Sequence, residues 1–440
     1  QSFIRESERL LAQAYGSKQA FFLVNGSTTG NLAMLLSTLR EGDGIILPRS
    51  IHRSIIHALS LVHATPIWVA NDMHPDYQIP LPLTPAQVAD AVRQHPHARA
   101  VFINSPTYHG LCAEIGAITE IVHRAHMLLL ADEAWGAHLA FHPAYPASAA
   151  DKADLCVQSM HKTLPVTNQG AVLHCNTTRI QHEYVANILS MFQTTSPSYV
   201  LLSTMDVARR QMVLQGFDIL EEILAIADYA RRRINAIEGL QCLSASELPA
   251  DIRLDPVKLT IRLDPQRFSM TGYALEQCLC ERFGVQVEMA DAQTILLMIK
   301  PGITRDDINY LALVLQQIQH EASKKAPLSL AAILPRQCHW KTILYPFQAF
   351  RSPYRLHPLA GSAGEICWES IYAYPPGTPV VMPGECLTQE IVDYLQEIIR
   401  LGAVVKGVTE RGEVLVCESP LILVQPHRHK FRRQRRTIRC

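Results

Sequence analysis

The sequence has no excess of charge and no long apolar run. Its 440 residues carry 40 Lys plus Arg against 40 Asp plus Glu, so the formal net charge is zero. This balance argues against a protein that binds nucleic acid over its whole surface. No stretch approaches the roughly 18 to 20 apolar residues that span a bilayer, and the first fifteen residues lack the apolar core of a secretory signal. We therefore expect a cytoplasmic protein with no membrane partner and no nucleic-acid partner.

Paired cysteines and metal-binding motifs are equally scarce. The 11 cysteines are odd in number and include no C-x-x-C pair, which suits reduced thiols better than a disulfide framework. His138 and His142 lie four residues apart, but no third ligand stands at a telling spacing, so no metal site is predicted. The chain opens with Gln1 rather than Met, which suggests that an N-terminal piece is missing or trimmed.

Short apolar runs alternate with amphipathic stretches from residue 20 to about 175. This pattern is typical of strand–helix units around a largely parallel sheet. Seven runs are candidate strands: 20–24, 44–48, 65–70, 99–104, 127–132, 155–159 and 170–174. The pattern therefore predicts an α/β fold with one large doubly wound domain. Ligands of such sheets bind at the carboxyl ends of the strands, so polar residues directly after these runs are the candidates for a site.

The rest of the chain divides into further parts. A long helical tract is expected from about 180 to 237, followed by an α+β region, a loop-rich stretch and a helix at 388–401. The last fourteen residues carry seven Lys or Arg and no acid, which predicts a disordered tail. We expect a large domain over 1–240, a small α+β domain over 241–325, a C-terminal domain over 326–425 and a basic tail over 426–440.

A phosphate-binding segment is the first candidate for chemistry. NGSTTGN, at 25–31, follows the expected strand at 20–24 and opens a helix. Its small residues let the backbone approach an anion, and the hydroxyls of Ser27, Thr28 and Thr29 add donors to those of the helix N-terminus. The segment therefore predicts a phosphate site, with a plain helix N-cap as the alternative.

An acid and a lysine follow two later strands. Asp132 ends the expected strand at 127–132, where an acid can hold a cationic ring nitrogen, although a strand-end cap or a metal-binding acid fits equally. Lys162 lies just past the strand at 155–159. Partial desolvation lowers the pKa of an amine and makes it nucleophilic, so Lys162 is a candidate for a Schiff base. The alternative is a solvated surface lysine.

The combination is more specific than its parts. A phosphate cup, Asp132 and Lys162 are the three anchors that pyridoxal phosphate needs, because the cup holds the phosphate, the acid keeps the pyridine nitrogen protonated and the lysine binds the aldehyde. His52 follows the expected strand at 44–48, where an aromatic ring can stack on the cofactor; an ordinary loop histidine is the alternative. The sequence thus predicts pyridoxal 5'-phosphate as the cofactor.

Motifs along nearly the whole chain then point to one family. They are FFLVNGSTTGN, RSIHRSIIHAL, SPTYHG, DEAWGAH, SMHKTLPVTNQGAVLH, TTSPSYVLLSTMDVAR, DPVKLTI, FGVQVEMAD and YPPGTPVVMPGE. In these motifs, from about residue 5 to 420, the chain resembles the pyridoxal-phosphate-dependent ornithine/lysine/arginine decarboxylases, which have an aspartate-aminotransferase-like fold.

The resemblance implies roles for individual residues. Lys162 is implied as the Schiff-base lysine, Asp132 as the partner of the pyridinium and His52 as the stacking ring. Trp135 stands where larger members have Trp and smaller ones His, and it is placed with the cofactor-binding residues. Phosphate contacts are implied for Ser27, Thr28, Thr29, Ser159 and His161.

The resemblance also implies an activity. It is the α-decarboxylation of arginine, lysine or ornithine to CO2 and a polyamine-type amine, with Lys162 or His161 returning the proton. Glu369 and Asp291 are candidates for the acid that holds the distal cation, with an ordinary surface or interface acid as the alternative. TTSPSY, at 194–199, resembles the segment that crosses to the partner's cofactor, which implies a homodimer or a higher homo-oligomer with a shared site.

Two departures from the family pattern keep other readings open. The sequence begins inside the helix that follows the family's N-terminal segment rich in Pro, Gly and His, which suggests either truncation or loss of that segment. GEICWES at 364–370 replaces G-R-I-S-A-E near the substrate entrance. The first alternative is an aminotransferase or lyase of the same fold. No arginine is assigned that would grip a substrate carboxylate as aminotransferases do, which favours decarboxylation. The second alternative is a catalytically impaired homologue.

Overall fold

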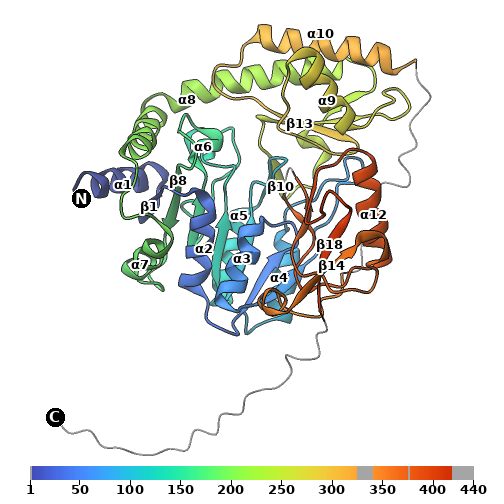
Figure 1. The fold of residues 1–440 in the computed structure, drawn as a ribbon. Coiled ribbons are helices and arrows are strands. Elements are labelled where there is room, and N and C mark those ends of the chain that lie inside the picture. Colours follow the sequence, from blue (N-terminus) through green and yellow to red (C-terminus); the bar gives the residue numbers. More distant parts are fainter. Residues whose placement is uncertain (1, 325–339, 375–376, 419–440) are drawn as a thin grey trace, which may run out of the picture.

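The computed structural model describes residues 2–324, 340–374 and 377–418. The predicted tail at 426–440 and the predicted boundary between residues 325 and 326 lie outside these ranges. Figure 1 shows a large sheet flanked by helices and two smaller parts. One is built around α9 (Gly272–Phe283) and α10 (Arg305–Ala322), and the C-terminal one is built around α12 (Gln389–Arg400), β14 (Tyr354–Pro358) and β18 (Glu413–Cys417). No described helix is both long and apolar enough to cross a membrane.

A seven-stranded, mostly parallel sheet forms the centre of the fold, as the sequence predicts. The strand order is β1-β8-β7-β6-β4-β2-β3, and only β8 runs against the others. Each expected strand is present within about a residue of its predicted bounds. The strands are β1 (Gln19–Leu23), β2 (Gly44–Pro48), β3 (Thr65–Val69), β4 (Ala100–Asn104), β6 (Leu128–Asp132), β7 (Leu155–Gln158) and β8 (Ala171–Cys175).

Helices cover both faces of this sheet, which is why its central strands are apolar without alternation. One face packs against α2 (Gly26–Thr38), α3 (Arg53–Val62) and α7 (His182–Phe192). The other packs against α1 (Ser2–Tyr15), α4 (Pro85–Gln94), α5 (Ile115–Arg124) and the start of α8 (Tyr199–Asn235). Within α2, a Cβ on Gly30 would lie 2.4 Å from Val157 Cγ2. The absence of a side chain there brings the start of α2 close to the end of β7.

The helical tract expected over 180–237 is two helices. α7 ends at Phe192, and α8 (Tyr199–Asn235) begins after an exposed segment. The prediction of one continuous tract was wrong because Pro197 disfavours helical backbone in the residue before it, and the Ser198 hydroxyl accepts a hydrogen bond from the Leu201 amide as a new N-cap.

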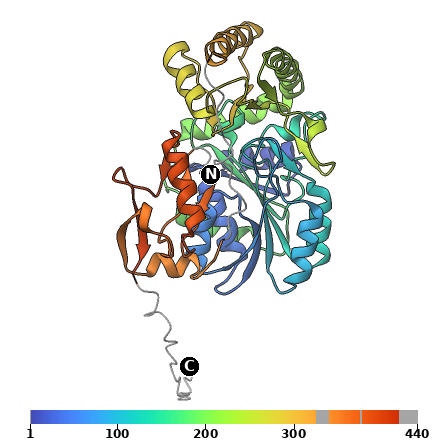
Figure 2. The same ribbon diagram turned by 90° about the vertical axis from the view of Figure 1, so that its right-hand side faces the viewer.

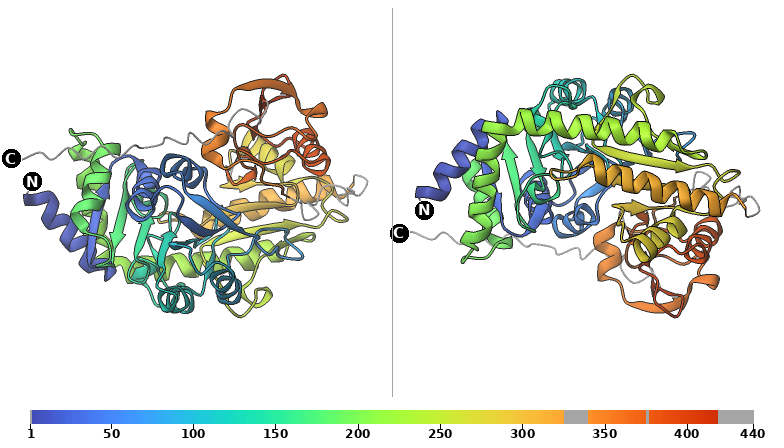
Figure 3. Two further views of the ribbon diagram at one scale, coloured as in Figure 1. Left: turned by 90° about the horizontal axis from the view of Figure 1, so that it is seen from below. Right: turned by 90° about the horizontal axis from the view of Figure 1, so that it is seen from above.

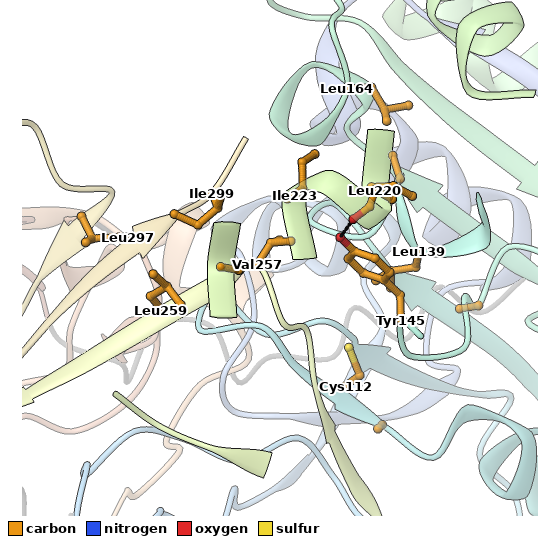
Figure 4. Packing of buried hydrophobic residues seen from close by; sticks show 14 of the residues in the cluster. Cys112, Leu139, Tyr145, Leu164, Leu220, Ile223, Val257, Leu259, Leu297 and Ile299 are labelled. Carbon is orange, nitrogen blue, oxygen red and sulfur yellow. Dashed lines mark hydrogen bonds between the residues drawn. The ribbon is translucent and has the colours of Figure 1, made fainter. Parts of the chain in front are cut away.

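The small part is a second α+β layer reached through α8. Its sheet has the order β12-β13-β11-β9, and α8 and α10 lie side by side (Figure 3). One apolar core runs from the large sheet into this layer, and Tyr145 donates a hydrogen bond to the Leu220 carbonyl of α8 at 3.3 Å (Figure 4). The elements are β9 (Leu240–Cys242), β10 (Ile252–Leu254), β11 (Lys258–Leu263), α9 (Gly272–Phe283), β12 (Met289–Ala290), β13 (Thr294–Met298) and α10 (Arg305–Ala322). β10 pairs with β5 (Leu111–Ala113) of the large domain.

The C-terminal part lies beside the large domain and below the small part (Figure 2). It has its own apolar core around α12. The loop-rich stretch expected over 326–383 contains regular elements where it is described, because short strands with few alternating positions escape a periodicity search. The elements are α11 (Pro346–Arg351), β14 (Tyr354–Pro358), β15 (Ile371–Ala373), β16 (Pro379–Val381), α12 (Gln389–Arg400), β17 (Val405–Lys406) and β18 (Glu413–Cys417).

A buried ion pair fastens the C-terminal part to the large domain. Arg49, which follows β2, donates to both carboxylate oxygens of Glu385, at 2.6 and 2.9 Å. Its guanidinium carbon also lies 4.1 Å from the centroid of the Trp340 ring. Both charged side chains are largely buried, so neither is solvated if its partner is removed.

We expect Glu385→Gln to lower the free energy of unfolding by about 3 kcal/mol, because the Arg49 charge stays buried without its counter-ion. Denaturant unfolding followed by circular dichroism measures this. Glu410→Gln, at an exposed position, is the matched control and should change little. Equal stability of the two variants would show that the pair does not hold the C-terminal part in place.

Candidate active site

A cavity of about 880 Å³ opens at the carboxyl edge of the central sheet. Its lining comes from three parts of the chain: the segments after the strands of the large sheet, residues 288–293 of the small part, and residues of the C-terminal part around β15, β16 and α12. The prediction that a site lies beyond the strand ends is therefore matched by a cavity at this edge.

Lys162 lies in α6 (Met160–Thr163), directly after β7, and lines the cavity. Its Nζ is 4.5 Å from the centroid of the Trp135 ring. Burial lowers the pKa of Lys162, while the nearby charges of Asp132 and Glu288 oppose that shift. A lysine with a lowered pKa is uncharged, and therefore nucleophilic, at a lower pH than a surface lysine.

Asp132 is the buried last residue of β6. Its Oδ2 accepts a hydrogen bond from Asn31 Nδ2 at 2.8 Å, and its Oδ1 accepts one from the Ala134 amide at 3.0 Å. The carboxylate is therefore fixed in place and faces the cavity. The sequence reasoning missed Asn31, although it is the last letter of NGSTTGN.

His52 is the N-cap of α3, on the opposite side of the same network. Its Nδ1 lies 2.8 Å from the Ser54 hydroxyl, and that hydroxyl accepts from Asn31 Nδ2 at 3.0 Å. A chain of hydrogen bonds thus joins His52 to Asp132. The His52 side chain is exposed at the cavity, and desolvation by the surrounding protein lowers its pKa to about 4, with the charge of Asp132 opposing this shift. A neutral ring can stack on an aromatic ligand.

The start of α2 forms a cradle in the cavity wall. Asn25, Gly26, Ser27 and Thr28 line the cavity, and the N-cap residue makes no side-chain hydrogen bond to the helix. Ser159 donates to the Ser27 hydroxyl at 2.8 Å, which joins the end of β7 to the cradle. Helical N–H groups without a side-chain cap are suited to an anion such as phosphate.

Two further predicted phosphate ligands have different placements. His161 lines the cavity, and its Nδ1–H donates to the Gly170 carbonyl at 2.9 Å, which fixes the ring. Thr29 is buried and does not line the cavity, because its hydroxyl donates to the Asn25 carbonyl at 3.3 Å. The expectation that all three hydroxyls of the segment face the ligand needs this correction.

The acids expected for the substrate are also rearranged. Glu369 does not line the cavity, because backbone bridges hold the segment 366–367 within the C-terminal part. Asp291 does line it, but its carboxylate accepts hydrogen bonds from the Gln293 and Thr294 amides and the Thr294 hydroxyl. Glu288 lines the cavity instead, and it accepts from the Tyr108 hydroxyl at 3.3 Å. The sequence reasoning overlooked Glu288 in FGVQVEMAD.

The histidines and cysteines lie apart from one another. His138 and His142 face different acids, Asp255 at 3.1 Å and Glu221 at 2.9 Å. Within the described ranges there is no group of three or more side chains placed to hold a metal ion. The cysteines of those ranges are free thiols.

Comparison with known proteins decides which family this arrangement belongs to. The family model "Orn/Lys/Arg decarboxylase, major domain" matches residues 1–307, and the model of the family's C-terminal domain matches residues 347–410. The chain belongs to the Orn/Lys/Arg decarboxylase family. It is 32% identical over 409 residues to an arginine decarboxylase of Bacillus subtilis, across 92% of this chain and 83% of that protein.

Solved structures agree with this membership at the level of the fold. A lysine decarboxylase of Francisella novicida superposes with a TM-score of 0.81 at 19% identity, covering 93% of this chain and 71% of that one. A ureidoglycine-glyoxylate aminotransferase of Bacillus subtilis superposes with a TM-score of 0.57 at 13% identity, covering 74% of this chain and 87% of that one. The predicted family and the aminotransferase-like fold class are both confirmed, and the α/β architecture is that of a decarboxylase of this family.

Proposed function

We propose that the protein is a pyridoxal-phosphate-dependent α-decarboxylase of a basic amino acid, with arginine as the first candidate. The observation that supports this proposal is the meeting of three anchors in one cavity: the amine of Lys162, the carboxylate of Asp132 and the open start of α2. These residues fit the aldehyde, the ring nitrogen and the phosphate of this cofactor.

Each side chain then has a defined task. Lys162 would bind the aldehyde of the cofactor, Asp132 would hold a proton at the ring nitrogen, and the His52 ring would stack on the cofactor. Pyridoxal phosphate supplies the sink for the electron pair left when CO2 departs. His161 or Lys162 returns a proton to the substrate Cα, because both lie at the end of β7 and line the cavity.

The cavity suits a substrate with a cationic side chain. Glu288 places a carboxylate in the wall, and the rings of Tyr108, Tyr273 and Tyr374 also line the cavity. An acid and aromatic faces both attract a guanidinium or an ammonium group. Arginine is put first because the matched relatives with 31 to 33% identity include proteins named arginine decarboxylase, whereas those named lysine decarboxylase are 22 to 24% identical.

The test is incubation of the cofactor-loaded protein with arginine, lysine and ornithine in parallel. We expect arginine to give its amine faster than lysine or ornithine does. Formation of an α-keto acid with no amine would favour an aminotransferase instead, and no product from any of the three would refute the proposal.

We also propose that the protein is a cytoplasmic homodimer with a shared site. Large apolar side chains are exposed along the first half of α8 and before it: Met191, Tyr199, Val200, Val207, Val213, Leu214 and Phe217. An apolar surface gathered on one helix is typical of a protein–protein contact, and this one continues from the largely exposed segment at 194–198. The free thiols support a reducing compartment.

We therefore expect Leu214→Glu to dissociate the protein, because a carboxylate would be buried in the apolar interface. Sedimentation velocity measures the change from dimer to monomer. Leu313→Glu is the matched control, since Leu313 is about equally exposed but lies on α10. The interface would be refuted if both variants sedimented as the wild type does.

A further inference from the structure

A second lysine, Lys258, lies near Lys162 but does not line the cavity. Lys258, the first residue of β11, is completely buried. Within the described part of the chain, its Nζ has no hydrogen-bond partner. A buried amine without an acceptor lowers the stability of a fold, whereas an apolar side chain of the same length would not. Packing alone therefore gives no reason for a lysine here.

The Trp135 ring lies close to both this amine and the amine of Lys162. The Lys258 Nζ is 3.5 Å from the centroid of the Trp135 ring, and the Lys162 Nζ is 4.5 Å from the same point. The Tyr108 ring meets the indole edge to face, with centroids 4.9 Å apart. An amine this close to an indole face is attracted by the ring when it is protonated and limits the ring's rotation in either state.

The position of Lys258 is itself fixed by its surroundings. Its carbonyl accepts a hydrogen bond from Arg231 Nη2 at 3.0 Å, which ties it to α8. A Cβ on Gly110 would lie 2.6 Å from the Lys258 Cγ, so only glycine lets the chain pass the lysine stem there. The backbone and stem of Lys258 are therefore fixed where its amine lies 3.5 Å from the centroid of the indole, and Lys258 itself does not line the cavity.

Several charged or titratable groups surround Lys258. Burial lowers its pKa to about 7, with Glu288 and Asp255 opposing the shift and Lys162 and Lys300 adding to it. The neighbouring His109 is also buried, and burial and the charge of Lys258 both lower the pKa of that histidine. The amine therefore changes its charge close to neutral pH, beside the ring that covers Lys162.

We propose that Lys258 is a positioning residue for the decarboxylation site: it holds the Trp135 indole in place against Lys162, and through that ring it sets how Lys162 meets the cofactor. The inference rests on the proposed function. It assigns Lys258 no contact with the substrate, because Lys258 does not line the cavity.

The first test measures stability and needs no cofactor. Lys258→Met keeps the length of the side chain and removes the buried amine, so its free energy of unfolding should exceed that of the wild type at pH 6. The pKa of Lys258 is about 7 in the folded chain and about 10.4 in the unfolded chain. Between these two pH values only the unfolded chain binds the proton, so the free energy of unfolding of the wild type rises with pH. The stability advantage of Lys258→Met therefore shrinks over the same range. A variant less stable than the wild type at pH 6 would assign Lys258 a structural role and overturn the proposal.

The second test is a double-mutant cycle with Trp135→Leu in the cofactor-loaded enzyme. We expect Lys258→Met to lower kcat about 10- to 100-fold and KM to change little, because the reacting groups are misplaced while the substrate's binding groups remain. It should also shift the pH midpoint at which the visible band of the lysine-bound cofactor changes. Both effects should be absent when Lys258→Met is added to Trp135→Leu, since the ring that transmits them is gone.

Lys152→Met, at a solvent-accessible ion pair, is the control and should change neither readout. Additive effects of Lys258→Met and Trp135→Leu, or an unchanged kcat and midpoint in Lys258→Met, would overturn the role of Lys258 alone. The proposed function fails by a different observation, namely a wild type that takes up no pyridoxal phosphate.

Discussion

Lys162→Ala is expected to abolish the visible absorption band of the cofactor-loaded protein and to lower the decarboxylation rate by about 10⁴-fold or more. Within the described ranges, two lysines line the cavity, Lys162 and Lys300. The change removes the amine of Lys162 and leaves that of Lys300, which lies 3.7 Å from the carboxylate of Glu288. Without it, the cofactor has no covalent bond to the protein before the substrate arrives.

The measurement combines absorption spectra with borohydride reduction and peptide mapping. In the wild type, reduction should leave the pyridoxyl group on Lys162 and remove activity permanently. Lys18→Ala, at an exposed position outside the cavity, is the control and should keep both the band and the rate. A labelled peptide that contains Lys300 or another lysine would contradict the assignment.

Asp132→Asn is expected to retain the cofactor but to lower kcat by about 10²- to 10³-fold, because an amide cannot keep a proton on the ring nitrogen in a buried site. The covalent anchor at Lys162 and the cradle at α2 are untouched by this change. Loss of rate with retention of the band is therefore the expected pattern.

The geometry provides a control for this variant. Asn31→Ala removes the hydrogen bond that the Asp132 Oδ2 accepts at 2.8 Å but leaves the charge, so its loss of rate should be smaller than that of Asp132→Asn. Equal losses in the two variants would show that the orientation of the carboxylate matters more than its charge. An unchanged rate in Asp132→Asn would refute the role of the residue.

Much of the fold and of the site could be predicted because parallel strands bring their carboxyl ends to one edge. Asp132 and Lys162 are 30 positions apart in the sequence. Asp132 ends β6, and Lys162 follows β7, which is the neighbouring strand of the sheet. Their meeting in one cavity follows from the strand pattern alone. The same logic places Ser27 and His52, each after the carboxyl end of another strand of that sheet.

Side-chain direction and long-range packing could not be predicted in this way. Thr29 turns into α2, with its hydroxyl bonded to the backbone, whereas Thr28 faces the cavity, and the motif letters do not separate the two. The segment before Glu369 is held by backbone bridges from Ile366 to Cys386 and from Cys367 to Val416. Lys258 reads as an ordinary lysine at a strand start, and only the packing of Gly110 and Trp135 around it shows that it is buried.

Carbon balance in the loaded wild-type enzyme tests the central claim most directly. Arginine labelled in its carboxyl carbon is incubated with the protein, and labelled CO2 and the amine are measured together. The proposed function predicts equal amounts of the two, with all of the label in CO2 and none in the amine. Consumption of arginine with the label retained in an α-keto acid, or no release of CO2 from arginine, lysine or ornithine, would contradict it.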